Sequence, residues 1–296
     1  MSIGVIGAGK WGSALFFALS QQNSDVCISS RRAREMQGFV PMQEALACEY
    51  LVITVPAQEV SAWLREHFVF KGQKILVASK GIEASSGKFL NEIYAEHIPD
   101  ENIAFLSGPS FATEVLQALP TALVINSHNE ALAKELGGLF PPFIKTYTST
   151  DVIGAEVAGA YKNVIAIAAG IASGLQLGNN AAASLISRGL VEMQRFGLHY
   201  GAKEESFVGL SGAGDLFLTA SSTMSRNFRV GLGLAKGLTQ EEILKELGEV
   251  AEGIGTAYAL HDIAQKEQLY LPIAREVHAM LEGKSPQDAL QTLLQR

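Results

Sequence analysis

The sequence predicts an α/β protein in two parts, a doubly wound sheet in the N-terminal half and an all-α domain in the C-terminal half. Short apolar segments alternate with helical patterns as far as about residue 147, and no convincing strand follows them. A length of 296 residues also suits two domains of ordinary size. We therefore predict one domain over residues 1–148 and a second, helical domain over residues 149–296.

The first half contains apolar runs of the length of a strand. Nearly every residue in these runs is apolar, as expected for parallel strands that are covered on both faces. The predicted strands are residues 3–6, 25–29, 50–56, 74–77, 103–106, 121–125 and 143–147. The predicted helices between them are residues 13–19, 57–67, 87–97 and 129–139.

The second half begins after a polar stretch, residues 148–151, whose side chains can cap a helix. The most apolar region, residues 157–178, contains Lys162 and Asn163 and is rich in Ala and Gly, which predicts a buried helix and not a membrane span. The predicted helices are residues 151–175, 179–200, 225–236, 239–246, 254–266, 272–282 and 285–295.

Three glycines with the spacing G-x-G-x-x-G follow the first strand, and a helix begins at once. Gly7 permits a tight turn, Gly9 has no Cβ to block a pyrophosphate, and Gly12 allows the helix to pack closely on the strand. Free N–H groups at the start of the helix face the anion. This context predicts dinucleotide binding by a Rossmann-like domain, and a glycine-rich turn without a ligand is the alternative.

The second strand ends in a basic turn that bears on the choice of cofactor. An NAD-binding domain is expected to carry an acidic residue there, about 20 residues beyond the glycines, but this chain has Arg31 and Arg32. Two guanidinium groups suit a 2′-phosphate, so NADP(H) is the favoured cofactor and NAD(H) remains possible. The alternative is a solvated basic turn.

Composition and charge argue against several classes of partner. A net charge of −7 gives no reason to expect nucleic acid or an anionic membrane, so local cations must hold any anionic ligand. Cys27 and Cys48 lack metal-type spacing, and we expect neither a metal site nor a disulfide scaffold. Met1 and Ser2 lead straight into the first strand without a basic leader, which indicates a cytoplasmic protein.

Three polar clusters in the second half can supply chemistry. Lys162 stands among apolar residues, so its ammonium either forms a structural ion pair or faces a cleft. The cleft is favoured because Gly159, one helical turn earlier, would leave open space for a ligand. Asp215, in a glycine-rich run, could hydrogen-bond a lysine. Ser225 could cap the next helix, and Arg226 could hold a phosphate.

Taken together in this order, these clusters resemble the bacterial-type NAD(P)-dependent sn-glycerol-3-phosphate dehydrogenases over nearly the whole chain. The resemblance implies an enzyme that interconverts dihydroxyacetone phosphate and sn-glycerol 3-phosphate, supplies phospholipid synthesis and forms a homodimer. The matching stretches are residues 7–12, 78–83, 106–112, 161–164, 180–181, 187–193, 211–219, 225–227 and 250–253.

The same resemblance implies roles for individual residues. Lys162 becomes the catalytic acid and base, and Asp215 becomes its catalytic partner. The implied substrate-binding residues are Lys80, Gly108, Ser110, Lys162, Asp215, Ser225, Arg226 and Asn227. Besides the glycines, the implied cofactor contacts are Trp11, Arg31, Arg32, Lys80, Ala112, Arg226, Val250 and Glu252.

The chain departs from the family pattern in two places. Residues 31–49 form a shorter segment than the family usually has, so the contacts usually made there to the adenosine end are not carried over. Lys10 stands where the family more often has a small polar residue, and we expect this lysine to add a contact to a cofactor phosphate.

Two other functions share part of this pattern. A β-hydroxyacid or 6-phosphogluconate-type dehydrogenase also joins a dinucleotide-binding domain to a helical one and uses a lysine. Residues 225–227 and 212–215 argue against that alternative. A non-catalytic NADP(H)-sensing protein would need the cofactor site alone, and the set Lys162, Asp215 and Arg226 argues against it.

Overall fold

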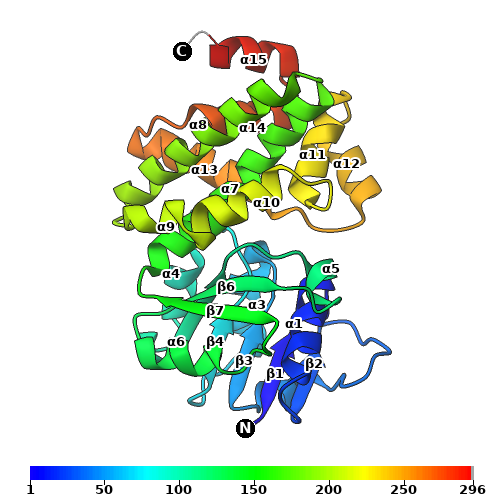
Figure 1. Ribbon diagram of the computed structural model, residues 1–296, viewed down its shortest axis with the longest axis vertical. Coiled ribbons are helices and arrows are strands. Elements are labelled where there is room, and N and C mark those ends of the chain that lie inside the picture. The colour runs from blue at the N-terminus through cyan, green and yellow to red at the C-terminus, as the bar shows by residue number, and fades with distance from the viewer. Residues whose placement is uncertain (295–296) are drawn as a thin grey trace.

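A computed structural model describes residues 1–294, and its helical half stacks on one end of its sheet half (Figure 1). One seven-stranded sheet has the order β2-β1-β3-β4-β5-β6-β7. The predicted strands are all present, although the third ends at Ile53 and not at residue 56. The strands are β1 (Ile3–Ile6), β2 (Val26–Ser29), β3 (Tyr50–Ile53), β4 (Lys74–Val77), β5 (Ile103–Ser107), β6 (Thr121–Asn126) and β7 (Ile144–Ser149).

The direction of β6 departs from regular strand–helix alternation. Strands β1 to β5 are parallel, whereas β6 pairs antiparallel with β5, and β7 pairs parallel with β6. A parallel return needs a crossover of a dozen or more residues, usually a helix. The connection from β5 to β6 contains only α5 (Ala112–Val115), so β6 runs back beside β5 in the opposite direction.

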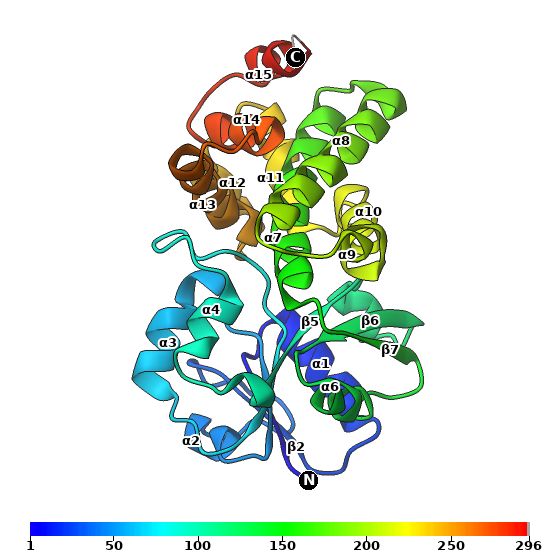
Figure 2. The same cartoon turned by 90° about the vertical axis from the view of Figure 1, so that its left-hand side faces the viewer.

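Helices cover both faces of the sheet, as a doubly wound fold requires (Figure 2). One apolar core lies between the sheet and α1, α5 and α6, and a second core lies between the other face and α2, α3 and α4. The remaining bounds in this half are α1 (Lys10–Ser20), α2 (Met42–Leu46), η1 (Ala57–Glu59), α3 (Val60–His67), α4 (Leu90–Ala95), η2 (Asp100–Asn102) and α6 (Glu130–Gly137).

The C-terminal half is helical throughout, as predicted. The structure adds three elements that the sequence did not predict, and they are α9 (Glu204–Val208), the π-helical turn η3 (Leu210–Gly214) and α10 (Asp215–Ala220). Residue 295 of the last predicted helix lies outside the described residues. The other helices are α7 (Val152–Gly174), α8 (Gly178–His199), α11 (Arg226–Ala235), α12 (Gln240–Leu247), α13 (Glu252–Glu267), α14 (Pro272–Leu281) and α15 (Pro286–Leu294).

Helix α7 is the centre of this half. Asp151 caps it by accepting a hydrogen bond from Gly154 N at 3.0 Å. The helix is long and apolar enough to cross a membrane, but 94% of its most apolar window is buried within the protein. It is therefore the core helix of the helical domain, as the sequence predicts.

Helices α7 and α11 cross with their backbones in contact. A Cβ added to Gly170 of α7 would lie 2.0 Å from Phe228 O, and one added to Gly231 of α11 would lie 2.0 Å from Ile167 O. Only glycine allows so close an approach at both positions. This crossing fixes the start of α11 relative to the middle of α7, and both carry residues of the predicted site.

Glu156 of α7 joins the helical half to the sheet half. Its Oε2 accepts a hydrogen bond from Asn91 N, in the first turn of α4, at 3.0 Å. Burial raises the pKa of this carboxyl to about 8, although backbone N–H groups of Asn91 and Leu90 act in the opposite direction. The fold therefore favours the protonated carboxyl over the ionised one.

Because the pKa of Glu156 is raised on folding, this residue should make the protein less stable as pH rises from about 4.5 through about 8. At 1.36 kcal/mol per pKa unit, we expect a loss of about 2 to 5 kcal/mol in the free energy of unfolding. In denaturant titrations between pH 5 and pH 8, Glu156→Gln should not show this loss in the free energy of unfolding. Exposed Glu246→Gln is the control, and equal pH slopes in wild type and Glu156→Gln would refute the expectation.

Candidate active site

A cavity of about 780 Å³ lies between the two halves. It opens beyond the carboxyl ends of β1, β3, β4 and β5, the edge at which doubly wound sheets bind ligands. The predicted site residues that line it are Gly9, Lys10, Trp11, Gly12, Lys80, Ser110, Ala112, Lys162, Ser225, Arg226, Asn227, Val250 and Glu252. The predicted residues outside its lining are Gly7, Arg31, Arg32, Gly108 and Asp215.

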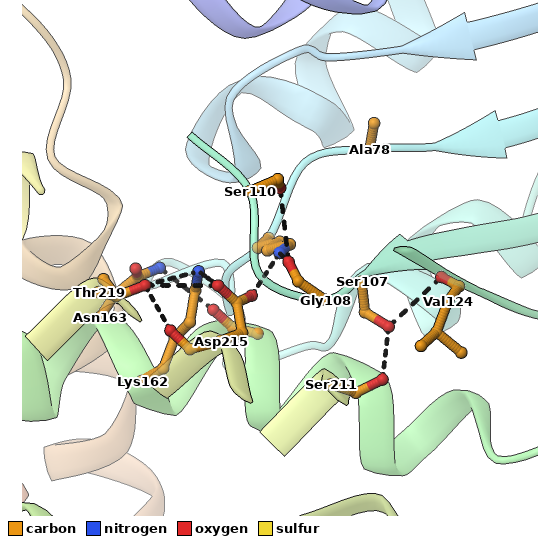
Figure 3. Close-up of polar contacts among 12 residues, drawn as sticks. Ala78, Ser107, Gly108, Ser110, Val124, Lys162, Asn163, Ser211, Asp215 and Thr219 are labelled. Atoms are coloured by element: carbon orange, nitrogen blue, oxygen red, sulfur yellow. Dashed lines mark hydrogen bonds and ion pairs between the residues drawn. The ribbon is translucent and has the colours of Figure 1, made fainter. Parts of the chain in front are cut away.

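Two lysines that line the cavity meet one buried carboxylate, and Figure 3 shows one of them, Lys162, beside Asp215. Lys162 Nζ lies 2.5 Å from Asp215 Oδ1, and Lys80 Nζ lies 2.6 Å from Asp215 Oδ2. Lys162 also donates a hydrogen bond to Thr219 Oγ1 at 3.1 Å. Asp215 is 1% exposed, and both lysines line the cavity in front of it.

Burial and charge together set the protonation of this cluster. Burial lowers the pKa of Lys162 to about 8, and the Asp215 carboxylate limits the decrease. Burial alone would raise the pKa of Asp215, but the charges of Lys162 and Lys80 outweigh it and hold that pKa below its usual range. At neutral pH the cluster is therefore an ionised carboxylate between two ammonium groups.

The position of Lys80 corrects one interpretation of the sequence. The space beside Gly159 does not admit a ligand, because a Cβ there would lie 3.2 to 3.4 Å from carbons of the Lys80 side chain. Gly159 thus makes room for Lys80 to reach Asp215. Lys80 Nζ also donates a hydrogen bond to Gly108 O at 3.3 Å, and Ser110 Oγ approaches the same oxygen at 3.4 Å.

Buried hydrogen bonds position Asp215 from the sheet half. Asp215 is the first residue of α10 and directly follows the π-helical turn η3. Within that turn, Ser211 Oγ lies 2.7 Å from Ser107 Oγ at the end of β5 (Figure 3). Asn126 Nδ2 donates to the same Ser107 oxygen at 2.8 Å. This network was not predicted from the sequence, although Ser107 and Asn126 are the polar last residues of largely apolar strands.

The glycine loop has the geometry of a phosphate cradle. Gly7 has φ +110°, and a Cβ on Gly12 would lie only 1.7 Å from Gly7 O. A Cβ on Gly9 would have no heavy atom within 4 Å, and Gly9 faces the cavity as the uncapped N-cap of α1. The first N–H groups of α1 therefore remain available to an anion. Trp11 Nε1, next to this loop, donates to Ala78 O at 3.1 Å.

Glu252 presents a buried acceptor that the protein does not satisfy. Its Oε1 accepts a hydrogen bond from Ala57 N at 3.2 Å, whereas its Oε2 is buried and has no hydrogen-bond partner. Burial raises the pKa of Glu252 to about 7. An unsatisfied buried oxygen beside a cavity fits a ligand that donates a hydrogen bond, such as a carboxamide. Together with the glycine loop, it suits a nicotinamide dinucleotide.

The two arginines predicted to select the cofactor lie outside the cavity lining. Arg31 is exposed and its Nη1 lies 3.2 Å from Glu59 Oε2, while Arg32 is also exposed. Their contact with a 2′-phosphate stays a prediction. Arg34 and Arg229 do line the cavity, and neither was predicted from the sequence. Arg229 lies one helical turn beyond Arg226, a spacing that could have indicated it.

The start of α11 brings three of the predicted site residues to the cavity. Ser225 caps this helix, as predicted, by accepting from Phe228 N at 3.2 Å. Arg226 follows at the first helical position and lines the cavity. Asn227 is held by two bonds, one to Asn163 Oδ1 at 2.9 Å and one from Gly253 N at 3.0 Å.

The comparisons with known proteins agree with this geometry. Residues 151–291 match the protein-family profile described as NAD-dependent glycerol-3-phosphate dehydrogenase C-terminus, and residues 35–133 match the profile described as the N-terminus. The glycerol-3-phosphate dehydrogenase [NAD(P)+] of Sulfurimonas denitrificans is 72% identical over 99% of this chain and 98% of its own length. The chain belongs to the NAD-dependent glycerol-3-phosphate dehydrogenase family. This confirms the resemblance drawn from the sequence.

A second relative and a crystal structure of the glycerol-3-phosphate dehydrogenase family also match this chain. The enzyme of the same name from Campylobacter jejuni strain RM1221 is 58% identical over 100% of this chain and 99% of its own length. The crystal structure of glycerol-3-phosphate dehydrogenase from Coxiella burnetii superposes with a TM-score of 0.90 at 33% identity, covering 100% of this chain and 99% of that one. The predicted combination of a Rossmann-like sheet with a helical domain is thereby confirmed.

Within residues 1–294, no group of three or more His, Cys, Asp or Glu side chains could hold a metal ion. The polar groups of the cavity are instead cations, hydroxyls and amides, together with Glu249 and Glu252. This set suits organic phosphates.

Proposed function

We propose that this dehydrogenase interconverts dihydroxyacetone phosphate and sn-glycerol 3-phosphate with NADP(H) or NAD(H). The observation that carries the proposal is the Lys80–Asp215–Lys162 cluster, which faces the same cavity as the glycine loop. Residues 1–148 would hold the cofactor and residues 149–296 the substrate. We further propose a cytoplasmic homodimer whose product, glycerol 3-phosphate, supplies phospholipid synthesis.

The chemistry needs an acid beside the substrate carbonyl. When bound, a reduced nicotinamide supplies hydride to the ketone carbon, which places negative charge on the carbonyl oxygen. The Lys162 ammonium can stabilise that charge and donate a proton to it, while Asp215 holds the ammonium in place. Lys80 adds a second positive charge on the other side of Asp215. In the reverse direction, neutral Lys162 accepts the proton of the alcohol.

The substrate phosphate takes no part in bond breaking and serves to position the carbonyl. Arg226 and the N–H groups at the start of α11 are the groups that we assign to it. The free energy of binding the phosphate would thereby serve to orient the reacting carbon of the substrate.

We propose that NADP(H) is the favoured cofactor. Arg31 and Arg32 lie at the end of β2, where a 2′-phosphate would be met, and Arg34 brings a third guanidinium to the cavity itself. Residues 31–49 form a shorter segment than the family usually has, so the usual contacts to the adenosine end are not carried over. NAD(H) therefore remains a possible cofactor.

The decisive test is NADPH oxidation in the presence of dihydroxyacetone phosphate, repeated with NADH. We expect substrate-dependent oxidation with both cofactors, and a lower KM for NADPH. Activity with 6-phosphogluconate but none with dihydroxyacetone phosphate would instead support a 6-phosphogluconate-type dehydrogenase. Binding of NADPH without any turnover would support a sensing protein.

The pKa of Lys162 makes the two directions of the reaction respond oppositely to pH. Ketone reduction needs the protonated amine, so its kcat should fall as pH rises through about 8. Alcohol oxidation needs the neutral amine and should become faster over the same range. Initial rates in both directions between pH 6 and pH 10 check this expectation, and profiles that move in parallel would contradict it.

A further inference from the structure

Glu249 connects the two halves of the enzyme at the cavity. Its Oε1 lies 2.6 Å from Lys10 Nζ, and its Oε2 lies 3.7 Å from Arg226 Nη1. Lys10 is the first residue of α1 in the sheet half, whereas Arg226 is the first residue of α11 in the helical half. All three line the cavity. One carboxylate therefore holds two cations that belong to different halves and to different anion sites.

The charge of Glu249 is opposite to most of the cavity. Its lining carries six cations, Lys10, Arg34, Lys80, Lys162, Arg226 and Arg229. The chain as a whole has a net charge of −7, so this positive charge is local. Of the two carboxyls in the lining, Glu252 has a pKa raised by burial to about 7, and Glu249 is the one paired with cations. Glu249 thus presents to these cations the same kind of charge as a phosphate.

The position of Glu249 in the chain allows its side chain to move away from Lys10 and Arg226. It lies in the short link between α12 and α13, directly after Gly248, which ends α12 with φ +62°. Ala251 is buried and fixes the far end of the link, while Val250 between them is 48% exposed. Lys10 is 68% exposed, so its contact with Glu249 can exchange without unpacking a core.

We propose that Glu249 competes with the phosphate groups of the ligands for Lys10 and Arg226, and thereby couples cofactor binding to substrate binding. This inference rests on the proposed function. A pyrophosphate at the glycine loop binds Lys10 and repels the Glu249 carboxylate, which then breaks its contact with Arg226. The substrate phosphate binds the released Arg226. Each ligand therefore raises the affinity for the other, because coupling between two sites is reciprocal.

The test measures the Kd of NADPH by its fluorescence at low salt, with and without saturating sn-glycerol 3-phosphate. These two ligands are both reduced and cannot react with each other. In the wild type, sn-glycerol 3-phosphate should tighten NADPH binding. Glu249→Gln should bind NADPH about twofold to fivefold more tightly by itself, the range expected for partly exposed charge pairs. The additional effect of sn-glycerol 3-phosphate should then largely disappear.

Two further variants make the result specific. Glu246→Gln removes the same charge from an exposed position of α12 and should leave both Kd values unchanged. Lys10→Gln should weaken NADPH binding, and adding Glu249→Gln to it should recover less affinity than in the wild-type background. The gain from Glu249→Gln should also shrink as salt is raised, because salt screens exposed charges.

An NADPH affinity that is unchanged or weaker in Glu249→Gln overturns the inference, and so does an undiminished effect of sn-glycerol 3-phosphate. Failure of the proposed function has a different signature. If the wild type binds NADPH but does not oxidise it with dihydroxyacetone phosphate, the function is wrong, while the comparison of Kd values for Lys10 and Glu249 variants still decides the competition. A wild type that does not bind NADPH refutes both.

Discussion

Replacing Lys162 by alanine is expected to lower kcat for the reduction of dihydroxyacetone phosphate by about 10²-fold to 10⁴-fold. The variant loses the ammonium that we assign as proton donor, and it keeps Lys80 as the partner of Asp215. Because Lys162 has no contact with the glycine loop, the Kd of NADPH should change little. Steady-state rates and NADPH fluorescence titrations measure the two effects separately.

Two comparisons make the Lys162 result decisive. Lys236→Ala, at an exposed position after α11, controls for the loss of a lysine and should have normal turnover. Lys80→Ala tests the other ammonium of the cluster. If Lys80→Ala abolishes turnover while Lys162→Ala keeps near-normal kcat, the proton donor is Lys80 and our assignment is wrong.

Replacing Asp215 by asparagine is expected to have the second large effect. The amide keeps the shape of the side chain, but the two ammonium groups lose the charge between them. Their repulsion and burial should lower the pKa of Lys162 further below about 8, so kcat for ketone reduction at pH 7 should fall by about 10²-fold. Breaking a buried ion pair should also cost about 3 to 5 kcal/mol in the free energy of unfolding.

The pH profile distinguishes this electrostatic effect from simple damage. In Asp215→Asn the rate of ketone reduction should partly recover as pH is lowered, because protonation of Lys162 is then restored. Exposed Asp262→Asn should keep the wild-type profile. A profile that is unchanged in shape and only lower in amplitude would show that Asp215 acts through the fold and not through the charge of Lys162.

Local signals in the sequence predicted much of the fold. Apolar strands, the glycine spacing and the helix caps at Asp151 and Ser225 each depend on neighbouring residues, and the structure shows both caps. The region of α9, η3 and α10 escaped prediction because its glycines disrupt helical periodicity. The antiparallel direction of β6 depends on the brevity of α5, which no strand pattern reveals.

The site was less accessible to prediction because its contacts join distant parts of the chain. The pairing of Lys162 with Asp215 was anticipated from residue chemistry, and the structure brings these groups to 2.5 Å. Lys80 was expected at the site by family resemblance, but its ion pair with Asp215 was not anticipated, since this pair depends on the space left by Gly159 across the interface between the halves. The roles of individual residues, including Arg31 and Arg32 in cofactor choice, stay predictions that the variants must test.

The Asp215 carboxylate, which Lys80 and Lys162 share, makes turnover sensitive to the relative position of the two halves. Lys80 comes from the sheet half and Lys162 from the helical half, so the charged centre is assembled only while the two halves are correctly apposed. A substitution that merely loosens the apposition would leave each half folded and yet separate the three charges. Lost turnover should therefore precede any detectable melting when the interface is perturbed.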